Sequence, residues 1–338
     1  MRRPNAPSNP RARRLAIALG DPAGIGAEVT LKALASRRPE TEAPLLVGCR
    51  RWLEQRYGEL RERGVEALRN PQDLEMIDLP LVEAVTAGWS TPATGHASFQ
   101  WLTAATEAVQ AGLCHALVTA PIAKSSWHAA GHHYPGQTER LAELAGVAEA
   151  SMLFTARNPS GNWRLNTLLA TTHIPLAEVP RQLNPALIER KLDALLRFCS
   201  AFSRQPHLVV AGLNPHAGEA GQLGREEIEW LKATLDAWNE THPEVRLDGP
   251  VPPDTCWLGA ATAWQHGSGG ADGYLALYHD QGLIPVKLLA FDAAVNTSLG
   301  LPFLRTSPDH GTGFAIAAEG IARAASMAAA LETAWNLG

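Results

Sequence analysis

The sequence lacks several features that would at once assign it to a class of protein. Its four cysteines lie far apart and form no CxxC pair, and disulfides usually mark short secreted chains, so reduced and buried thiols are expected. No apolar run reaches the roughly 18 residues that a membrane span requires. The formal net charge is only −5, which gives no electrostatic footprint for nucleic acid or for an anionic membrane surface. We therefore expect neither a nucleic-acid partner nor a membrane partner.

Internal repeats, heptad arrays and long low-complexity linkers are absent as well. The 338 residues, of which 46% are hydrophobic, suffice for a large core or for two lobes that share a cleft. The first fourteen residues, MRRPNAPSNPRARR, are rich in arginine and proline, and no apolar signal core follows them. A disordered cytoplasmic tail over residues 1–14 is expected rather than a transit peptide.

Short apolar runs alternate with helical stretches along the whole chain, which is typical of an α/β fold. Several of these runs lack polar alternation, as expected for strands that are buried on both faces. Strands are predicted at 15–19, 45–47, 116–119, 165–171, 208–213 and 274–278. Helices are predicted from residue 27 and at 98–112, 138–145, 184–202, 225–239 and roughly 314–335. This order predicts two interleaved α/β lobes with a cleft between them.

The first predicted strand runs into the turn GDPAGIG, with glycines at positions 20, 24 and 26. Such a turn before a helix can expose backbone N–H groups to an anion. Its spacing is neither GxGxxG nor that of a P-loop, because no Gly-Lys-Ser/Thr follows. An anion site and a purely structural tight turn are both consistent with this segment.

Three histidines each follow an apolar strand: His173 in TTHIPL, His216 in NPHAGE and His279 in YHDQG. Ligand sites in open α/β sheets gather beyond the carboxyl ends of the strands. Three imidazoles at that edge would suit a divalent cation and leave positions open for substrate. Their spacings match no local metal motif, so capped structural histidines are the alternative.

Two polar segments are candidates for recognition of an anion. The first runs from TAPIAK, with Lys124, to PGQTE, with Gln137 and Thr138. Thr138 as a helix N-cap and Lys124 as a surface charge are the simpler interpretations. The second segment supplies Lys287, Asn296 and Arg305. Two cations and an amide suit a phosphate or a carboxylate, and their setting among Gly and Pro turns argues against an ordinary surface loop.

Taken together, these motifs resemble those of the 4-hydroxythreonine-4-phosphate dehydrogenase family. GDPAGIG, TAPIAK, YPGQTE, TTHIPL, GLNPHAGE, GPVPPDT, YHDQGLIPVK and VNTSLGLPFLRTSPDHGT occur in the order expected for that family, from about Leu15 to Gly313. The resemblance implies a pair of α/β/α lobes similar to isopropylmalate dehydrogenase, approximately 15–125 plus 300–337, and 126–299. It also implies a homodimer with its sites at the subunit interface.

The resemblance assigns roles to individual residues. The family's metal ligands fall on His173, His216 and His279, with His279 expected to reach across from the partner subunit. Its substrate-binding positions fall on Gln137, Thr138, Lys287, Asn296 and Arg305. Here the sequence departs from the family, because Gln137 replaces the usual histidine of a GHTE motif. An amide carries no positive charge and no titrating proton, which bears on substrate preference.

The implied reaction is oxidation of 4-phosphooxy-L-threonine at C3, with NAD (or NADP) as hydride acceptor. Loss of CO2 from the resulting β-keto acid gives 3-amino-2-oxopropyl phosphate, a step of pyridoxal 5'-phosphate (vitamin B6) biosynthesis. One divalent metal per subunit (zinc, magnesium or cobalt) would lower the pKa of the reacting hydroxyl. Asp254 and Asp280 are candidates either for orienting a ligand histidine or for the general base. No motif marks the residues that bind the nicotinamide.

Three other functions share some of these features. A dehydrogenase of the same fold that acts on threonate or erythronate phosphate would carry the same motifs. A metal-dependent phosphate hydrolase would also combine histidines with cationic residues. A phosphate-binding module without catalysis is the third alternative.

Overall fold

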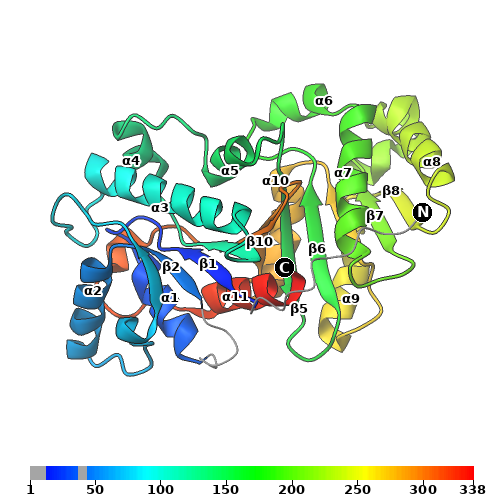
Figure 1. Cartoon of the computed structure of the whole chain (residues 1–338). Helices are drawn as coiled ribbons and strands as arrows, with labels where there is room; N and C mark the ends of the chain where they lie inside the picture. The colour runs from blue at the N-terminus through cyan, green and yellow to red at the C-terminus, as the bar shows by residue number, and fades with distance from the viewer. Residues whose placement is uncertain (1–12, 37–43) are drawn as a thin grey trace, which may run out of the picture. The chain divides into compact units, whose positions relative to one another are not determined.

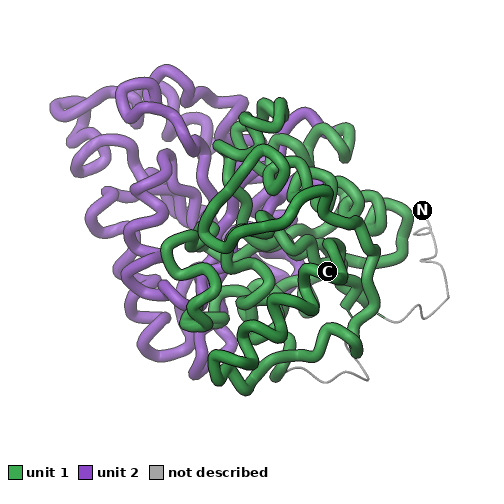
Figure 2. The backbone as a smooth tube through the Cα atoms, turned by 90° about the vertical axis from the view of Figure 1, so that its left-hand side faces the viewer, with its two compact units in different colours: residues 1–146, 302–338 green, residues 147–301 purple. Residues whose placement is uncertain are grey.

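The computed structural model describes residues 13–36 and 44–338. The chain forms two compact units: unit 1 contains residues up to 146 and from 302 onward, and unit 2 is residues 147–301 (Figure 2). The first unit boundary falls after Gly146 rather than near residue 125, because helices α4 (Lys124–Ala129) and α5 (Gln137–Ala145) pack on α3 (Pro92–Gln110) of unit 1. Residues 1–12 of the expected terminal tail lie outside the described residues. No helix among the described residues is long and apolar enough to cross a membrane.

Unit 1 is built on parallel strands in the order β3-β2-β1-β4-β11. The three central strands are buried on both faces, which explains why they are continuous apolar runs. The strands are β1 (Leu15–Ala18), β2 (Leu45–Gly48), β3 (Glu75–Asp78), β4 (Ala116–Thr119) and β11 (Leu304–Pro308).

Helices cover both faces of this sheet (Figure 1). Helix α3 packs on β1, β2 and β4. It begins with a capping box in which Thr91, the N-cap, and Thr94 exchange hydrogen bonds, and Pro92 is its first residue. Helix α11 packs on β4, β11 and α1. The helices are α1 (Gly26–Ala35), α2 (Arg50–Glu62), α3 (Pro92–Gln110), α4 (Lys124–Ala129), α5 (Gln137–Ala145) and α11 (Ala325–Leu337).

Unit 2 has the strand order β10-β5-β6-β9-β7-β8. The β10–β5 and β5–β6 pairs are antiparallel, and β6, β9, β7 and β8 run parallel. The carboxyl ends of β6, β9 and β7 therefore meet at one edge of the sheet. The strands are β5 (Ser151–Arg157), β6 (Arg164–Leu169), β7 (His207–Ala211), β8 (Arg246–Val251), β9 (Gly273–Ala276) and β10 (Val295–Leu299).

Two hydrophobic clusters fill the two faces of the unit 2 sheet. One buries Leu192 and Leu195 of α7 and Trp238 of α8, and the other buries Ala260 of α9 and Val286 of α10. The main helices are α6 (Val179–Gln182), α7 (Pro185–Cys199), α8 (Lys232–Glu240), α9 (Leu258–His266) and α10 (His279–Ala290). This three-layer arrangement confirms the α/β prediction.

The structure also corrects some predicted elements. The last helix begins at Ala325 rather than near 314, because Ala318 and Gly320 adopt positive φ and interrupt it. The segment from His279 to Ala290, for which no helix was predicted, is helix α10 despite Pro285. The four cysteines are free and buried, as predicted.

Candidate active site

The three predicted histidines follow β6, β9 and β7, the adjacent parallel strands of unit 2. The rings of His173 and His279 lie side by side within one chain, with their centroids 5.4 Å apart. All three histidines are solvent-accessible, since His279 is half-buried and the other two are exposed. The three histidines predicted as metal ligands thus follow the carboxyl ends of β6, β9 and β7, where a ligand site was expected.

His279 is the first residue of α10 and has a carboxylate beside it. Its Nδ1 lies 2.7 Å from Oδ1 of Asp280. Because a carboxylate only accepts, Nδ1 carries the hydrogen, and in the neutral imidazole Nε2 is then the nitrogen with the lone pair. This is the arrangement in which a carboxylate orients a ligand histidine. Asp254, the other predicted acid, is exposed and has no hydrogen bond or ion pair among the described residues.

His216 opens a run of five consecutive residues with left-handed backbone geometry, 216–220. Its φ is 53°, and only Gly218 in the run is a glycine. Left-handed geometry costs about 1–2 kcal/mol for each residue with a Cβ, so the surrounding structure must stabilise this segment. Such segments occur mainly where a site needs a particular backbone path.

The donor types at this edge fit a divalent metal, because imidazoles with an orienting carboxylate are common ligands of zinc and cobalt. Among residues 13–36 and 44–338, no three His, Cys, Asp or Glu side chains are gathered closely enough to hold an ion. A single chain thus brings two of the predicted ligands together, His173 and His279, while the arrangement of all three stays a prediction.

Unit 1 brings two predicted substrate residues to the carboxyl end of β4. Arg305 is only 3% exposed and donates to the Thr119 hydroxyl from Nε and Nη2, at 3.1 and 2.7 Å. Burial lowers the pKa of Arg305 to about 10, which Glu139 opposes, so the side chain keeps its charge at neutral pH. Gln137 donates from Nε2 to the carbonyl of Ala120, at 3.1 Å.

Because the amide nitrogen of Gln137 is bonded to Ala120, the amide oxygen is the group left to accept a further hydrogen bond. A carbonyl can only accept, so the bond to Ala120 fixes which end of the amide carries hydrogen. Oε1 of Gln137 is buried and has no hydrogen-bond partner among residues 13–36 and 44–338. The next residue, Thr138, is the second residue of α5, whose N-cap is Gly136. The interpretation of Thr138 as an N-cap is therefore wrong.

The GDPAGIG turn uses its N–H groups within the protein. Asp21, 1% exposed, accepts from the backbone of Ala23 and from the hydroxyls of Ser90 and Ser126, at 2.9–3.0 Å. The N–H of Gly24 is bonded to Asp21, and that of Ile25 to Thr312. A Cβ at Gly20 would lie 2.3 Å from the carbonyl oxygen of Pro121. These contacts favour the structural turn over an anion site.

Lys287 and Asn296 lie in unit 2, on α10 and β10. Both are half-buried, and the ammonium of Lys287 lies 5.8 Å from the ring centre of Phe291. Oδ1 of Asn296 is buried and has no hydrogen-bond partner within the part of the chain that the structure describes. These two residues thus belong to a different unit from Arg305 and Gln137.

Residues that hold the histidine loops were not predicted from the sequence. Gln281 is 7% exposed, accepts from the N–H of Leu277 and donates to the carbonyl of Gly212. Glu227 is 2% exposed and accepts from the N–H groups of Leu213 and Asn214, both at 2.8 Å. A sequence signal existed, since a glutamine two residues after His279 and an acid inside an amphipathic helix are polar residues at core positions.

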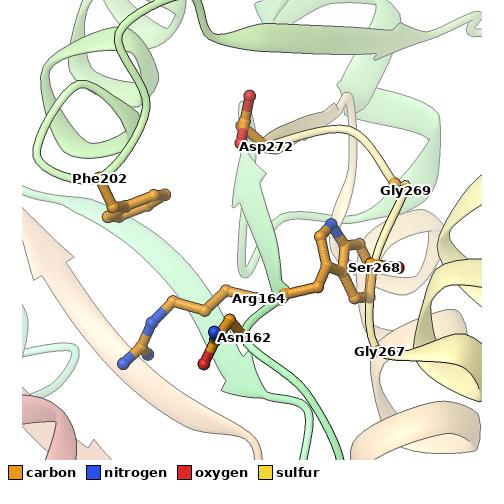
Figure 3. A pocket seen from close by; sticks show the side chains of 9 residues that line it. Asn162, Arg164, Phe202, Gly267, Ser268, Gly269 and Asp272 are labelled. Carbon is orange, nitrogen blue, oxygen red and sulfur yellow. The ribbon is translucent and has the colours of Figure 1, made fainter.

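A separate pocket lies at the opposite, amino-terminal end of the unit 2 strands (Figure 3). Its volume is about 340 Å³, and Arg164, Phe202 and Asp272 line it together with the loop 267–270. None of the predicted site residues lines this pocket, so it is distinct from the histidine edge.

Comparison with known proteins places this architecture in a family. The profile of the family described as pyridoxal phosphate biosynthetic protein PdxA matches residues 40–334. A 4-hydroxythreonine-4-phosphate dehydrogenase from a Synechococcus species is 66% identical over 328 residues, covering 96% of this chain and 99% of that protein. The crystal structure of 4-hydroxythreonine-4-phosphate dehydrogenase from Klebsiella pneumoniae superposes with a TM-score of 0.81 and 35% identity, covering 98% and 99% of the two chains.

The fold is shared more widely. The isocitrate dehydrogenase of Methylococcus capsulatus has a TM-score of 0.50 at 13% identity, covering 95% of this chain and 83% of that one. That likeness concerns the fold alone. The family match and the full-length relative decide the assignment: the chain belongs to the 4-hydroxythreonine-4-phosphate dehydrogenase (PdxA) family.

Proposed function

We propose that this protein is an NAD-dependent 4-hydroxythreonine-4-phosphate dehydrogenase of pyridoxal 5'-phosphate biosynthesis. It would oxidise 4-phosphooxy-L-threonine at C3 and release CO2 to form 3-amino-2-oxopropyl phosphate. The observation that carries the proposal is the 66% identity, over 96% of the chain, to a relative of that name. A biosynthetic role of this kind also suits a cytoplasmic location.

The metal ligands in this proposal are His173, His216 and His279, with Asp280 orienting His279. The 5.4 Å separation of two of these rings and the 2.7 Å bond from His279 to Asp280 support it. A divalent cation held there would lower the pKa of the substrate hydroxyl. Asp254, exposed and without a bonding partner in the described part of the chain, is the candidate for the group that accepts the hydroxyl proton.

The substrate anions are assigned to Arg305, Lys287 and the amino end of α5 at Thr138. A buried guanidinium makes strong, directional bonds to phosphate or carboxylate. Asn296 and Gln137 each have a buried amide oxygen that accepts no hydrogen bond from the described residues. These two oxygens suit donors on the substrate, namely its ammonium or hydroxyl groups. NAD, with NADP as the alternative, supplies the hydride acceptor, while the chain binds and orients the substrate.

A homodimer is part of the proposal. Helix α10, which starts at His279, exposes Ile284, Leu288 and Phe291, of which Leu288 is 81% exposed. The spacing of these residues puts them on one face of the helix, and exposed apolar stripes of this kind mark interfaces. A second copy that covers this face would lie next to His279, as expected for a site shared between subunits.

A second candidate function is oxidation of another phosphorylated hydroxy acid by the same chemistry. This second function is considered because Gln137 stands where the family usually has a histidine, a change that bears on substrate preference. Threonate and erythronate phosphates carry a C2 hydroxyl in place of the ammonium group of 4-phosphooxy-L-threonine, so they offer one neutral O–H donor where the amino acid offers three N–H donors and a positive charge. The amide oxygens of Gln137 and Asn296 support the amino-acid phosphate as the first choice.

One assay separates these functions. NADH formation is followed with the three phosphorylated substrates, each with and without a chelator. We expect turnover of 4-phosphooxy-L-threonine that is lost on chelation and restored by added metal. Preference for threonate or erythronate phosphate would select the second function. Release of inorganic phosphate without NADH would indicate a hydrolase, and binding without turnover a phosphate-binding module.

A further inference from the structure

The left-handed segment 216–220 is held by a dense group of buried contacts around Glu227. One carboxylate oxygen of Glu227 accepts from the N–H groups of both Leu213 and Asn214, at 2.8 Å. The other accepts from the side-chain amide of Asn214, at 2.9 Å. One buried carboxylate thus fixes the backbone that immediately precedes His216.

The contacts around this carboxylate leave no room for rearrangement. A Cβ on Gly218 would lie 2.9 Å from Oε2 of Glu227 and 2.8 Å from the carbonyl oxygen of Gly224. A Cβ on Gly224 would lie 2.2 Å from the side chain of Asn214. The path of residues 213–218 is therefore determined by close packing as well as by hydrogen bonds.

The same loop is tied to the other two histidine loops. Gln281 joins the carbonyl of Gly212, four residues before His216, to the N–H of Leu277, two residues before His279, at 2.7 and 2.6 Å. The carbonyl of Leu277 in turn accepts from the hydroxyl of Thr171, two residues before His173, at 2.8 Å. Buried hydrogen bonds thus form a continuous chain from Thr171 through Leu277 and Gln281 to the loop that Glu227 holds.

We propose that Glu227 is a positioning residue, which fixes His216 in its left-handed conformation so that the three histidine loops keep a common geometry. Glu227 acts through its hydrogen bonds to the backbone of Leu213 and Asn214 and to the side-chain amide of Asn214. This inference rests on the proposed metal site. Supporting carboxylates of this kind typically change metal affinity by about 10- to 100-fold when they are removed.

The test compares Glu227→Gln and Glu227→Ala with a matched control, Glu229→Gln. Glu229 lies on the same helical segment, but its side chain is exposed and, among the described residues, forms an ion pair with Arg225 alone. Glutamine keeps an acceptor for the two backbone N–H groups but sets an NH2 group against the amide of Asn214. The probe is Co²⁺ added to the metal-free full-length protein, with its visible absorption spectrum and its dissociation constant as readouts. Hydrogen exchange of the amides at 213–220 is measured on the same metal-free samples.

We expect Glu227→Gln to weaken Co²⁺ binding about tenfold and to change the shape of the cobalt spectrum at saturation. Glu227→Ala should weaken binding about 100-fold and speed amide exchange at 213–220. Glu229→Gln should match the wild type in all three measurements. A variant that merely lost folded protein would lower the amplitude of the spectrum without changing its shape.

Two failures are distinguishable. If the wild-type protein binds no Co²⁺, the proposed metal site is wrong, and the exchange rates alone then decide whether Glu227 fixes the loop. If the wild type binds Co²⁺, and both Glu227 variants show its affinity, spectrum and exchange rates, the positioning role is overturned.

Discussion

The guanidinium of Arg305 is held against the hydroxyl of Thr119, which accepts from both Nε and Nη2. The two residues lie on neighbouring parallel strands, β11 and β4. Their contact fixes a buried cation at the carboxyl end of β4, next to Ala120, the residue that binds Gln137. Orientation of the cation is thus built into the sheet rather than left to a flexible loop.

Replacing Arg305 should therefore cost a large part of substrate recognition. We expect Arg305→Ala to lower kcat/KM by about 30- to 150-fold, equivalent to about 2–3 kcal/mol. Arg305→Lys should also be impaired, because lysine cannot make two bonds to Thr119 while facing an anion. Thr119→Val should lose less, since it removes the support and not the cation. Arg181→Ala, at an arginine exposed on α6, is the control and should behave as wild type.

For Gln137 we expect a smaller loss of kcat/KM than for Arg305, and one that does not depend on the substrate phosphate. Because its free group is an acceptor, Gln137→Ala should cost less than Arg305→Ala, and its effect should be nearly the same with or without the substrate phosphate. Losses are compared as kcat/KM for 4-phosphooxy-L-threonine and for unphosphorylated 4-hydroxythreonine. For Arg305 variants most of the damage should disappear with the unphosphorylated substrate if the partner is the phosphate. A phosphate-dependent loss at Gln137 would contradict the acceptor assignment.

Glycine substitutions test the packing around His216. Gly224 has a φ of +154°, and a Cβ there would collide with Asn214, so Gly224→Ala should destabilise the protein by about 1–3 kcal/mol. Gly58 lies inside α2 with nothing within 4 Å of an added Cβ. Gly58→Ala should stabilise by about 0.5–1 kcal/mol. Thermal unfolding measures both, and equal effects of the two changes would refute the packing argument.

A histidine contact in unit 1 predicts a dependence of stability on pH. His132 lies face to face with Phe99, at 3.7 Å between centroids, and 2.9 Å from Nδ1 of His96. Burial, followed by the charges of His96, Arg140 and His133, lowers the pKa of His132 below its usual 6.5. A proton therefore binds the unfolded chain at a higher pH than the folded one. The stability contributed by neutral His132 is fully present above about pH 6.5 and is lost as the pH falls towards the folded-state pKa.

The variant His132→Phe keeps the stack on Phe99 and removes the titrating group. Its melting temperature should fall less steeply between pH 7 and pH 5 than that of the wild type. His266→Gln, at an exposed histidine of unit 2, should keep the wild-type slope. Identical slopes for all three proteins would show that His132 does not contribute.

The exposed face of α10 predicts the oligomeric state. We expect Leu288→Glu to convert a dimer into a monomer and to remove activity, because a charge would be buried in the interface. Leu113→Glu, at an exposed leucine of unit 1, should leave the dimer intact. Sedimentation at the assay concentration gives the answer, and an active monomer would refute the shared site.

The apolar strands were predictable because burial on both faces leaves a continuous hydrophobic run. Strands β10 and β11 were missed for the opposite reason, since Thr297, Ser298, Thr306 and Ser307 are polar yet buried. The edge strand β8 contains Gly249 and Pro250, which an edge tolerates but a sequence pattern does not reveal. Helix α10 was not predicted because it contains Pro285, a residue that usually interrupts a helix.

The sequence identified the candidate residues of the site, but not their hydrogen-bond partners or the orientation of their side chains. The strand-end pattern and the motifs identified the histidines, and the structure lays His173 beside His279. The supporting roles of Glu227 and Gln281 were not predicted: the sequence marks them only as polar residues at core positions, and it does not reveal which backbone groups they bind. The direction of the Gln137 amide likewise depends on a carbonyl seventeen residues away.

The division of the chain into units has a consequence for synthesis. Unit 2 is complete once Leu301 has been made, whereas β4 of unit 1 pairs with β11, which begins at Leu304. Helix α11, which covers β4 and β11, ends at Leu337. On the ribosome, the middle of the chain can therefore fold while the first 146 residues still carry an open strand edge, which is a site for unwanted pairing. That edge is closed only when β11, which is made after unit 2, pairs with β4.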